Sequence, residues 1–130
     1  MKSSFVNGHE LSYHYNIKKD DIILGISSYL HDSSICLLRN GKIIYASQEE
    51  RHTRIKNDNS FPFLALLNGL NYLDLDKNKI KNIIFHESLN CIKKEERKKI
   101  KNRLISDLSF IDIKDPNIYF LDHHYSHAAA

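Results

Sequence analysis

Apolar residues in the first half of the chain come in short runs separated by polar segments, which is the pattern of β-strands. The runs lie at 22–26, 35–38 and 43–46. The first shows little alternation, as expected of a strand that is covered on both faces. Asn40-Gly41, a pair that readily takes positive φ, predicts a tight turn between the second and third runs. We therefore expect three consecutive strands.

Two later segments have apolar residues at helical spacing. The first covers 63–74; we expect Ser60 to cap it and Pro62 to stand in its first turn, with Gly69 as its weak point. The second covers 92–108, and its charged residues are expected to face solvent, with a binding patch as the alternative. The residues of this second helix that should face the core are Ile92, Ile100, Leu104 and Leu108.

Two more strands are expected at 81–87 and 118–121, and Asp122 can cap a helix that begins at His123. The order is β-β-β-α-β-α-β. This order predicts an α/β fold of the ribonuclease-H-like (actin-like) kind, with helices layered on a mixed sheet. Residues 1–20 are expected to form an N-terminal extension with no assigned role.

Composition narrows the classes of function. The 130 residues suffice for one domain, and 42% hydrophobic with 27% charged residues is ordinary for a soluble protein. The net charge of +3 comes from basic residues scattered among acids, so a nucleic-acid surface is not required. Cys36 and Cys91 form no CxxC pair, and no apolar run approaches the ~20 residues of a membrane span. We expect a cytoplasmic protein with free thiols and no membrane contact.

Candidate chemistry begins in the polar segment 27–34, which contains His31, Asp32 and Ser33. The segment 47–59 follows the third strand and is dense in charge. Its charged residues are Glu49, Glu50, Arg51, Arg54, Lys56 and Asp58. Such a run is usually a solvated face, but Arg and Lys close behind a His-Asp-Ser loop can also clamp a phosphate. The arginines can equally pair with the neighbouring carboxylates, and both alternatives stay open.

His123 and His127 are four residues apart, so one helix would project both from the same face toward one metal ion. A plain polar helix start is an equal alternative. A metal site would need a third ligand, which we expect to be a carboxylate from elsewhere in the protein. Iron, zinc or another divalent ion would suit such a site. The alanine-rich end is unusual for a domain boundary, so we expect residues 21–130 to be half of a larger unit.

Three separated motifs in order then identify a resemblance. LGISSYLHDSSICLLRNGKIIYASQEERHTRIKND, the FP pair and DHHYSHAAA resemble the amino-terminal part of the O-carbamoyltransferases of the nodulation and antibiotic-tailoring type. The similarity covers about Asp21 to Ala130. Proteins like these carry a Kae1-like domain made of two ribonuclease-H-like halves, followed by a YrdC-like domain.

The resemblance implies a reaction and a set of site residues. Carbamoyl phosphate and ATP would give carbamoyl adenylate at the YrdC-like domain, and the carbamoyl group would pass to a hydroxyl of a small-molecule or glycan acceptor at a metal site. His123 and His127 correspond to the paired metal ligands, with an aspartate beyond Ala130 as the third. The other residues that it implies are His31 and Lys56 as catalytic groups, and Asp32, Ser33, Arg51 and Arg54 as co-substrate contacts.

The chemistry is compatible with these roles. A metal or cation can stabilise the oxyanion that forms when an alcohol attacks the carbamoyl carbonyl, and His31 can take the hydroxyl proton. Without the second half-domain and the YrdC-like domain, we expect this chain alone to be inactive. The alternatives are a Kae1-like tRNA threonylcarbamoyl-transfer protein and a non-catalytic ribonuclease-H-like binding module, for which a homodimer is possible.

Overall fold

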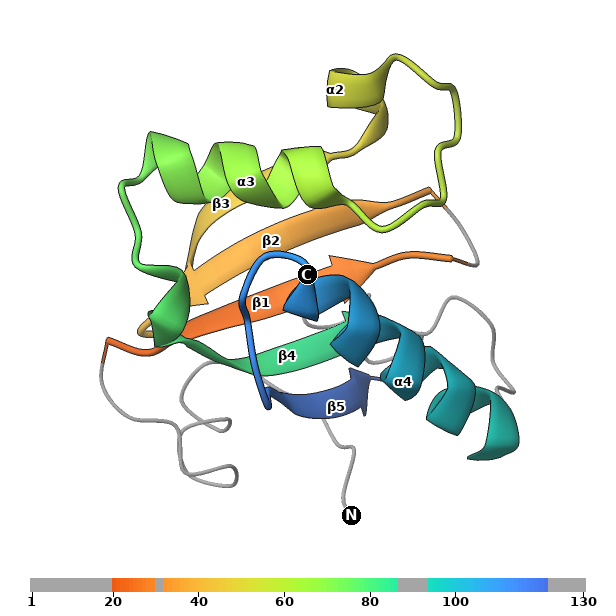
Figure 1. The fold of residues 1–130 in the computed structure, drawn as a ribbon. Helices are drawn as coiled ribbons and strands as arrows, with labels where there is room; N and C mark the ends of the chain where they lie inside the picture. The colour runs from red at the N-terminus through yellow and green to blue at the C-terminus, as the bar shows by residue number, and fades with distance from the viewer. Residues whose placement is uncertain (1–19, 30–31, 87–93, 122–130) are drawn as a thin grey trace.

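The three apolar runs of the first half form three adjacent strands of a mixed β-sheet, and the first run is its central strand (Figure 1). The computed structural model describes residues 20–29, 32–86 and 94–121. Within these residues the sheet has five strands in the order β3-β2-β1-β4-β5. The strands are β1 (Ile22–Ser27), β2 (Ser34–Arg39), β3 (Lys42–Gln48), β4 (Ile80–His86) and β5 (Asn117–Leu121). The helices are α2 (Glu50–Thr53), α3 (Phe63–Tyr72), the 3-10 turn η1 (Lys77–Lys79) and α4 (Lys94–Ser109).

The sheet combines two kinds of pairing. Strands β1, β2 and β3 form an antiparallel meander, whereas β1 pairs with β4, and β4 with β5, in parallel. The parallel pairs need long crossover connections, and α3 and α4 lie in these connections. The predicted α/β class, mixed sheet and order of the main elements are therefore confirmed. The expected helix from His123 and the N-terminal extension lie outside the described residues, as do Ile92 and Cys91.

The turn between β2 and β3 follows the sequence prediction. Asn40 has φ 53° and Gly41 has φ 77°, so both residues of the Asn-Gly pair are in the left-handed region. A turn with both central residues in this region fits the right-handed twist of the two strands of a hairpin. The one-turn helix α2, in contrast, lies in the charged segment for which the sequence predicted no regular element.

The core lies between the sheet and the two long helices. Leu24 and Leu37 of the sheet are fully buried, as are Leu66 of α3 and Leu104 and Leu108 of α4. The predicted inward face of α4 is therefore confirmed for Ile100, Leu104 and Leu108.

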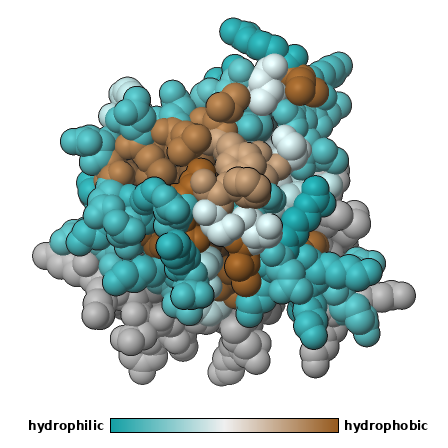
Figure 2. Space-filling view, in the orientation of Figure 1, coloured by the Kyte–Doolittle hydropathy of each residue, from teal (hydrophilic) through white to brown (hydrophobic). Residues whose placement is uncertain are grey.

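Two of the apolar residues at helical spacing in α3 remain exposed. Leu64 and Leu67 are 47% and 44% exposed, because α3 contacts the sheet through only part of its surface. Figure 2 shows apolar side chains gathered over α3, with hydrophilic residues around them.

The start of α3 also differs from the prediction. Ser60 does not cap this helix: the N-cap position is Pro62, and no side chain of the cap residue itself accepts a hydrogen bond. The Glu49 carboxylate instead accepts hydrogen bonds from the backbone N–H groups of Leu64, at 3.3 Å, and Ala65, at 2.8 Å. A carboxylate from the end of β3 thus satisfies the free donors of the first turn of α3.

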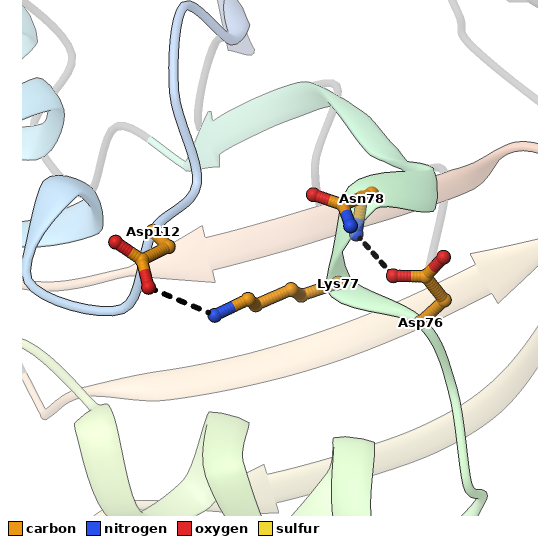
Figure 3. A network of polar contacts seen from close by, with 4 residues as sticks. All are labelled: Asp76, Lys77, Asn78 and Asp112. Carbon is orange, nitrogen blue, oxygen red and sulfur yellow. Dashed lines mark hydrogen bonds and ion pairs between the residues drawn. The ribbon is translucent and has the colours of Figure 1, made fainter.

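A small polar network lies where β4 and β5 begin (Figure 3). The Asp76 carboxylate accepts a hydrogen bond from the backbone N–H of Asn78 at 2.9 Å and so caps η1. Lys77 forms an ion pair with Asp112 at 3.2 Å, which joins η1 to the turn after α4. Exposed pairs of this kind contribute little to stability, so we assign the network a connecting role. No helix in the described part of the chain is long and apolar enough to cross a membrane.

Candidate functional site

The candidate residues follow strands that end at one edge of the sheet. Because β3, β1, β4 and β5 all run in the same direction, their carboxyl ends meet at that edge. The register places Ser27 opposite Ser34, and Ser34 opposite Gln48, so the loop after β1 and the turn after β3 are neighbours. Open α/β sheets bind ligands outside the carboxyl ends of their strands. The topology therefore brings residues 28–29, 32–33 and 49–60 to the edge where a ligand is expected.

Buried hydroxyls hold the loop after β1 in place. Ser28 and Ser33 are each 1% exposed, and both hydroxyls donate to the backbone carbonyl of Ser60. The backbone N–H of Ser33 donates to the carbonyl of Asp58 at 2.7 Å, and its own carbonyl accepts from Glu49 N–H at 2.9 Å. Ser33, predicted as a co-substrate contact, thus has its hydroxyl engaged within the protein. Asp32, the other described candidate of this loop, is partly buried.

Tyr29 connects this loop to α4, a contact that no sequence pattern predicts. Its φ is 71°, and its backbone N–H donates to the carbonyl of Asn59 at 2.7 Å. The phenol donates to the Asp107 carboxylate at 2.6 Å, and the Arg103 guanidinium lies 4.1 Å from the centre of the ring. Burial, followed by this hydrogen bond to Asp107, raises the pKa of Tyr29 well above its usual range. Part of the charged surface of α4 therefore anchors the loop.

The turn after β3 is organised by three carboxylates. Glu49 is 3% exposed and caps α3 as described above. Glu50 accepts a hydrogen bond from the backbone N–H of Asn57 at 3.1 Å. Asp58 is 8% exposed and accepts from the Ser60 backbone N–H at 2.9 Å and from the Thr53 hydroxyl at 2.8 Å. All three carboxylates therefore bind N–H or O–H groups of the protein.

The hydrogen bonds at Asp58 have an electrostatic consequence. The side chain and backbone N–H of Ser60, and then the Thr53 hydroxyl, stabilise the ionised form and lower the pKa of Asp58. The carboxylate thus stays charged in mildly acidic solution.

The three cations of the same turn are placed differently. Arg51, Arg54 and Lys56 are all exposed. In the part of the chain that the structure describes, their side chains form no hydrogen bond or ion pair. The alternative in which Arg51 and Arg54 pair with the neighbouring carboxylates is therefore wrong, because those carboxylates bind other groups. The turn instead presents three exposed cations.

One further contact was not found from the sequence. The Ser47 hydroxyl lies 2.8 Å from Nε2 of His52, and joins the end of β3 to α2. Both side chains are partly buried. No motif predicts this pair, because it depends on how the short helix α2 folds back on β3.

Several predicted site residues lie outside the described part of the chain. These are His31, His123 and His127. Among the described residues, no group of three or more His, Cys, Asp and Glu side chains is arranged to hold a metal ion. The metal site therefore stays a prediction that rests on the two imidazoles of His123 and His127, which are suitable donors for iron or zinc.

Two comparisons with known proteins bear on this edge. Residues 22–95, more than half of the chain, match a family described as carbamoyltransferase N-terminus. The chain is also 31% identical to an uncharacterized protein of Synechocystis sp., over 83% of this chain. The aligned region is 22% of that relative, so the chain spans less than a quarter of its length. The family match includes the loop after β1 and the whole turn after β3.

Proposed function

This chain belongs to the carbamoyltransferase N-terminal family, and on that premise we propose that it is the amino-terminal half of the Kae1-like domain of an O-carbamoyltransferase. The complete protein transfers the carbamoyl group of carbamoyl phosphate, by way of carbamoyl adenylate made with ATP, to a hydroxyl of a small-molecule or glycan acceptor. A second half-domain and a YrdC-like domain complete the catalytic unit, and this half alone is inactive.

The topology supports this assignment. An antiparallel meander β1-β2-β3, extended by parallel β4 and β5 in the order β3-β2-β1-β4-β5, fits a ribonuclease-H-like half-domain. Both crossover helices lie in the connections β3–β4 and β4–β5. The carboxyl edge of such a sheet is where a co-substrate would lie against the second half-domain.

The observation that carries the proposal is the turn after β3. Arg51, Arg54 and Lys56 are exposed cations without a protein partner in the described residues, next to the loop that contains Asp32. One guanidinium group can bind two phosphate oxygens at once, and a lysine ammonium group adds a further positive charge. Carbamoyl phosphate, ATP and carbamoyl adenylate all carry phosphate, so cations at this edge are suited to these ligands.

The chemistry at the acceptor hydroxyl is assigned to His31, to Lys56 and to a metal site. His31 takes the hydroxyl proton, and Lys56 stabilises the carbamoyl oxygen as charge develops on it. His123 and His127 hold a divalent metal ion, which supplies Lewis-acid polarisation of the carbamoyl carbonyl when it is bound.

The test uses the full-length protein with carbamoyl phosphate, ATP, a divalent metal and a panel of hydroxyl acceptors. We expect carbamoyl phosphate to be consumed and a carbamoylated acceptor to form. Lys56→Gln should abolish most of this turnover, whereas Lys114→Gln should not, because Lys114 is exposed in the turn before β5, at the opposite edge of the sheet. The proposal fails if no acceptor supports carbamoyl phosphate consumption. Threonylcarbamoyl transfer to tRNA would favour the tRNA-modifying alternative.

A further inference from the structure

We propose that Glu50 and Asp58 are positioning residues, which hold the turn after β3 so that its three cations stay available for a phosphate ligand. The inference rests on the proposed function and extends it to residues that do not themselves touch the ligand. Its basis is the way that the turn separates its acidic from its basic side chains.

The turn after β3 contains equal numbers of acidic and basic residues, but the fold places the two kinds of side chain differently. Residues 49–58 contain three acids and three bases. The acids bind inward: Glu50 accepts from the backbone N–H of Asn57, and Asp58 accepts from Ser60 and Thr53. The bases remain exposed without partners in the described residues. The turn thus presents exposed cations, while its carboxylates already accept hydrogen bonds from donors of the protein.

The pairing that the sequence would favour does not form. Glu50 and Arg54 are four residues apart, a spacing at which a glutamate and an arginine commonly pair on a helix. Here α2 ends at Thr53, and the Glu50 carboxylate binds the N–H of Asn57 instead. No ion pair therefore forms between Glu50 and Arg54, and the charge of the Arg54 guanidinium is not neutralised by Glu50.

The backbone conformation of Arg54 also supports the inference. Arg54 is the C-cap of α2 with φ 64° and ψ 16°, and Asn57 has φ 57°. The left-handed region is unfavourable for an ordinary residue, and helix ends of this shape usually carry glycine. Such strain persists only where the surrounding contacts fix the backbone, and it collects at binding sites. An arginine at this position retains a guanidinium that glycine would lack.

Asp58 provides the second anchor. Its side chain binds residues on both sides, Thr53 at the end of α2 and Ser60 before α3. Its carbonyl also accepts the N–H of Ser33, so the same residue fixes the turn to the loop after β1. Loss of the carboxylate should loosen the segment that contains Arg54 and Lys56 relative to that loop.

The experiment measures binding of inorganic pyrophosphate and turnover of carbamoyl phosphate by the full-length protein. The variants are Asp58→Asn, which keeps the shape of the buried side chain, and Glu50→Ala, which removes the more exposed carboxylate. Glu96→Gln, an exposed carboxylate on α4, is the matched control. Each variant is made in the wild-type background and in a Lys56→Gln background, and thermal unfolding of each identifies any that do not fold.

If the two carboxylates position the cations, Asp58→Asn and Glu50→Ala should weaken pyrophosphate binding and raise the KM for carbamoyl phosphate by about fivefold to tenfold, the size of one ordinary hydrogen bond. Glu96→Gln should change neither. In the Lys56→Gln background the same changes should weaken pyrophosphate binding by a smaller factor than in the wild-type background, because residues that act through one another are not additive.

A merely structural role predicts a different pattern. It lowers the unfolding temperature and leaves the affinity of the folded protein unchanged, or it reduces affinity equally in both backgrounds; either result overturns the inference. Wild-type protein that binds no pyrophosphate would overturn it as well. Pyrophosphate binding with the expected coupling, but without consumption of carbamoyl phosphate, would support the positioning role and refute the proposed enzyme.

Discussion

Gly69 lies in the interior of α3, where the helix passes over the sheet. Its replacement by alanine has two opposite effects on the free energy of unfolding, a gain in helix propensity and a steric cost. Alanine is favoured over glycine inside a helix by about 1 kcal/mol. A Cβ at this position, however, would lie 2.6 Å and 2.7 Å from the Cδ2 and Cε2 atoms of Tyr45, and 3.2 Å from Cδ1 of Leu37. Both distances to the ring are too short for real atoms.

The ring of Tyr45 cannot move aside freely. Its hydroxyl accepts a hydrogen bond from the amide of Asn68 at 2.7 Å, and its ring lies 6.5 Å from that of Tyr72. Overpacking a close contact costs about 1–3 kcal/mol, and loss of the hydrogen bond costs about 1 kcal/mol more. The steric cost exceeds the gain in propensity, so we expect Gly69→Ala to lower the free energy of unfolding by roughly 1–3 kcal/mol.

Urea unfolding followed by circular dichroism measures this change. The control is a cycle with Tyr45→Ala: once the ring is removed, Gly69→Ala should become stabilising by up to about 1 kcal/mol, the propensity difference alone. Stabilisation by Gly69→Ala with Tyr45 in place would refute the reasoning, because it would mean that the ring yields without cost.

Three other changes test single contacts of the site. The pKa of Asp58 is lowered in the folded state, so the ionised carboxylate stabilises the fold at pH values above the ordinary carboxyl pKa of about 4, and this stabilisation is lost as the pH falls through the lowered pKa. When the free energy of unfolding is measured over a pH series, Asp58→Asn should therefore flatten its dependence on pH in that range. Arg54→Gly should raise the unfolding free energy by up to about 1 kcal/mol, by relief of the left-handed backbone, while it weakens pyrophosphate binding in a titration; weaker stability would contradict the strain argument. Tyr29→Phe removes the hydrogen bond to Asp107 and should cost about 1 kcal/mol in chemical denaturation, near the low end for charged partners because both side chains are partly exposed; an unchanged midpoint would show that the bond adds nothing.

Much of the fold could be predicted from local patterns. The three strands, the Asn40-Gly41 turn and the inward face of α4 follow from the period of apolar residues and from the backbone freedom of two turn residues. The candidate segments 27–34 and 47–59 were also recognised, because they are dense in polar groups directly after predicted strands.

The partners of individual side chains could not be predicted in the same way. Sequence spacing suggested Ser60 as the cap of α3 and ion pairs for Arg51 and Arg54 within their own turn. The cap is instead Glu49, whose carboxylate reaches Ala65, sixteen residues further along the chain. Tyr29 likewise finds Asp107 at a separation of 78 residues.

The sequence by itself determined which segments become strands and helices, and which of them carry chemically active side chains, because both depend on residues close together in the chain. Only the tertiary structure decided which carboxylates are occupied and which cations remain exposed. That choice depends on which backbone N–H groups the fold leaves without a partner, such as those at the first turn of α3, and on which side chains the parallel strands bring to the same edge.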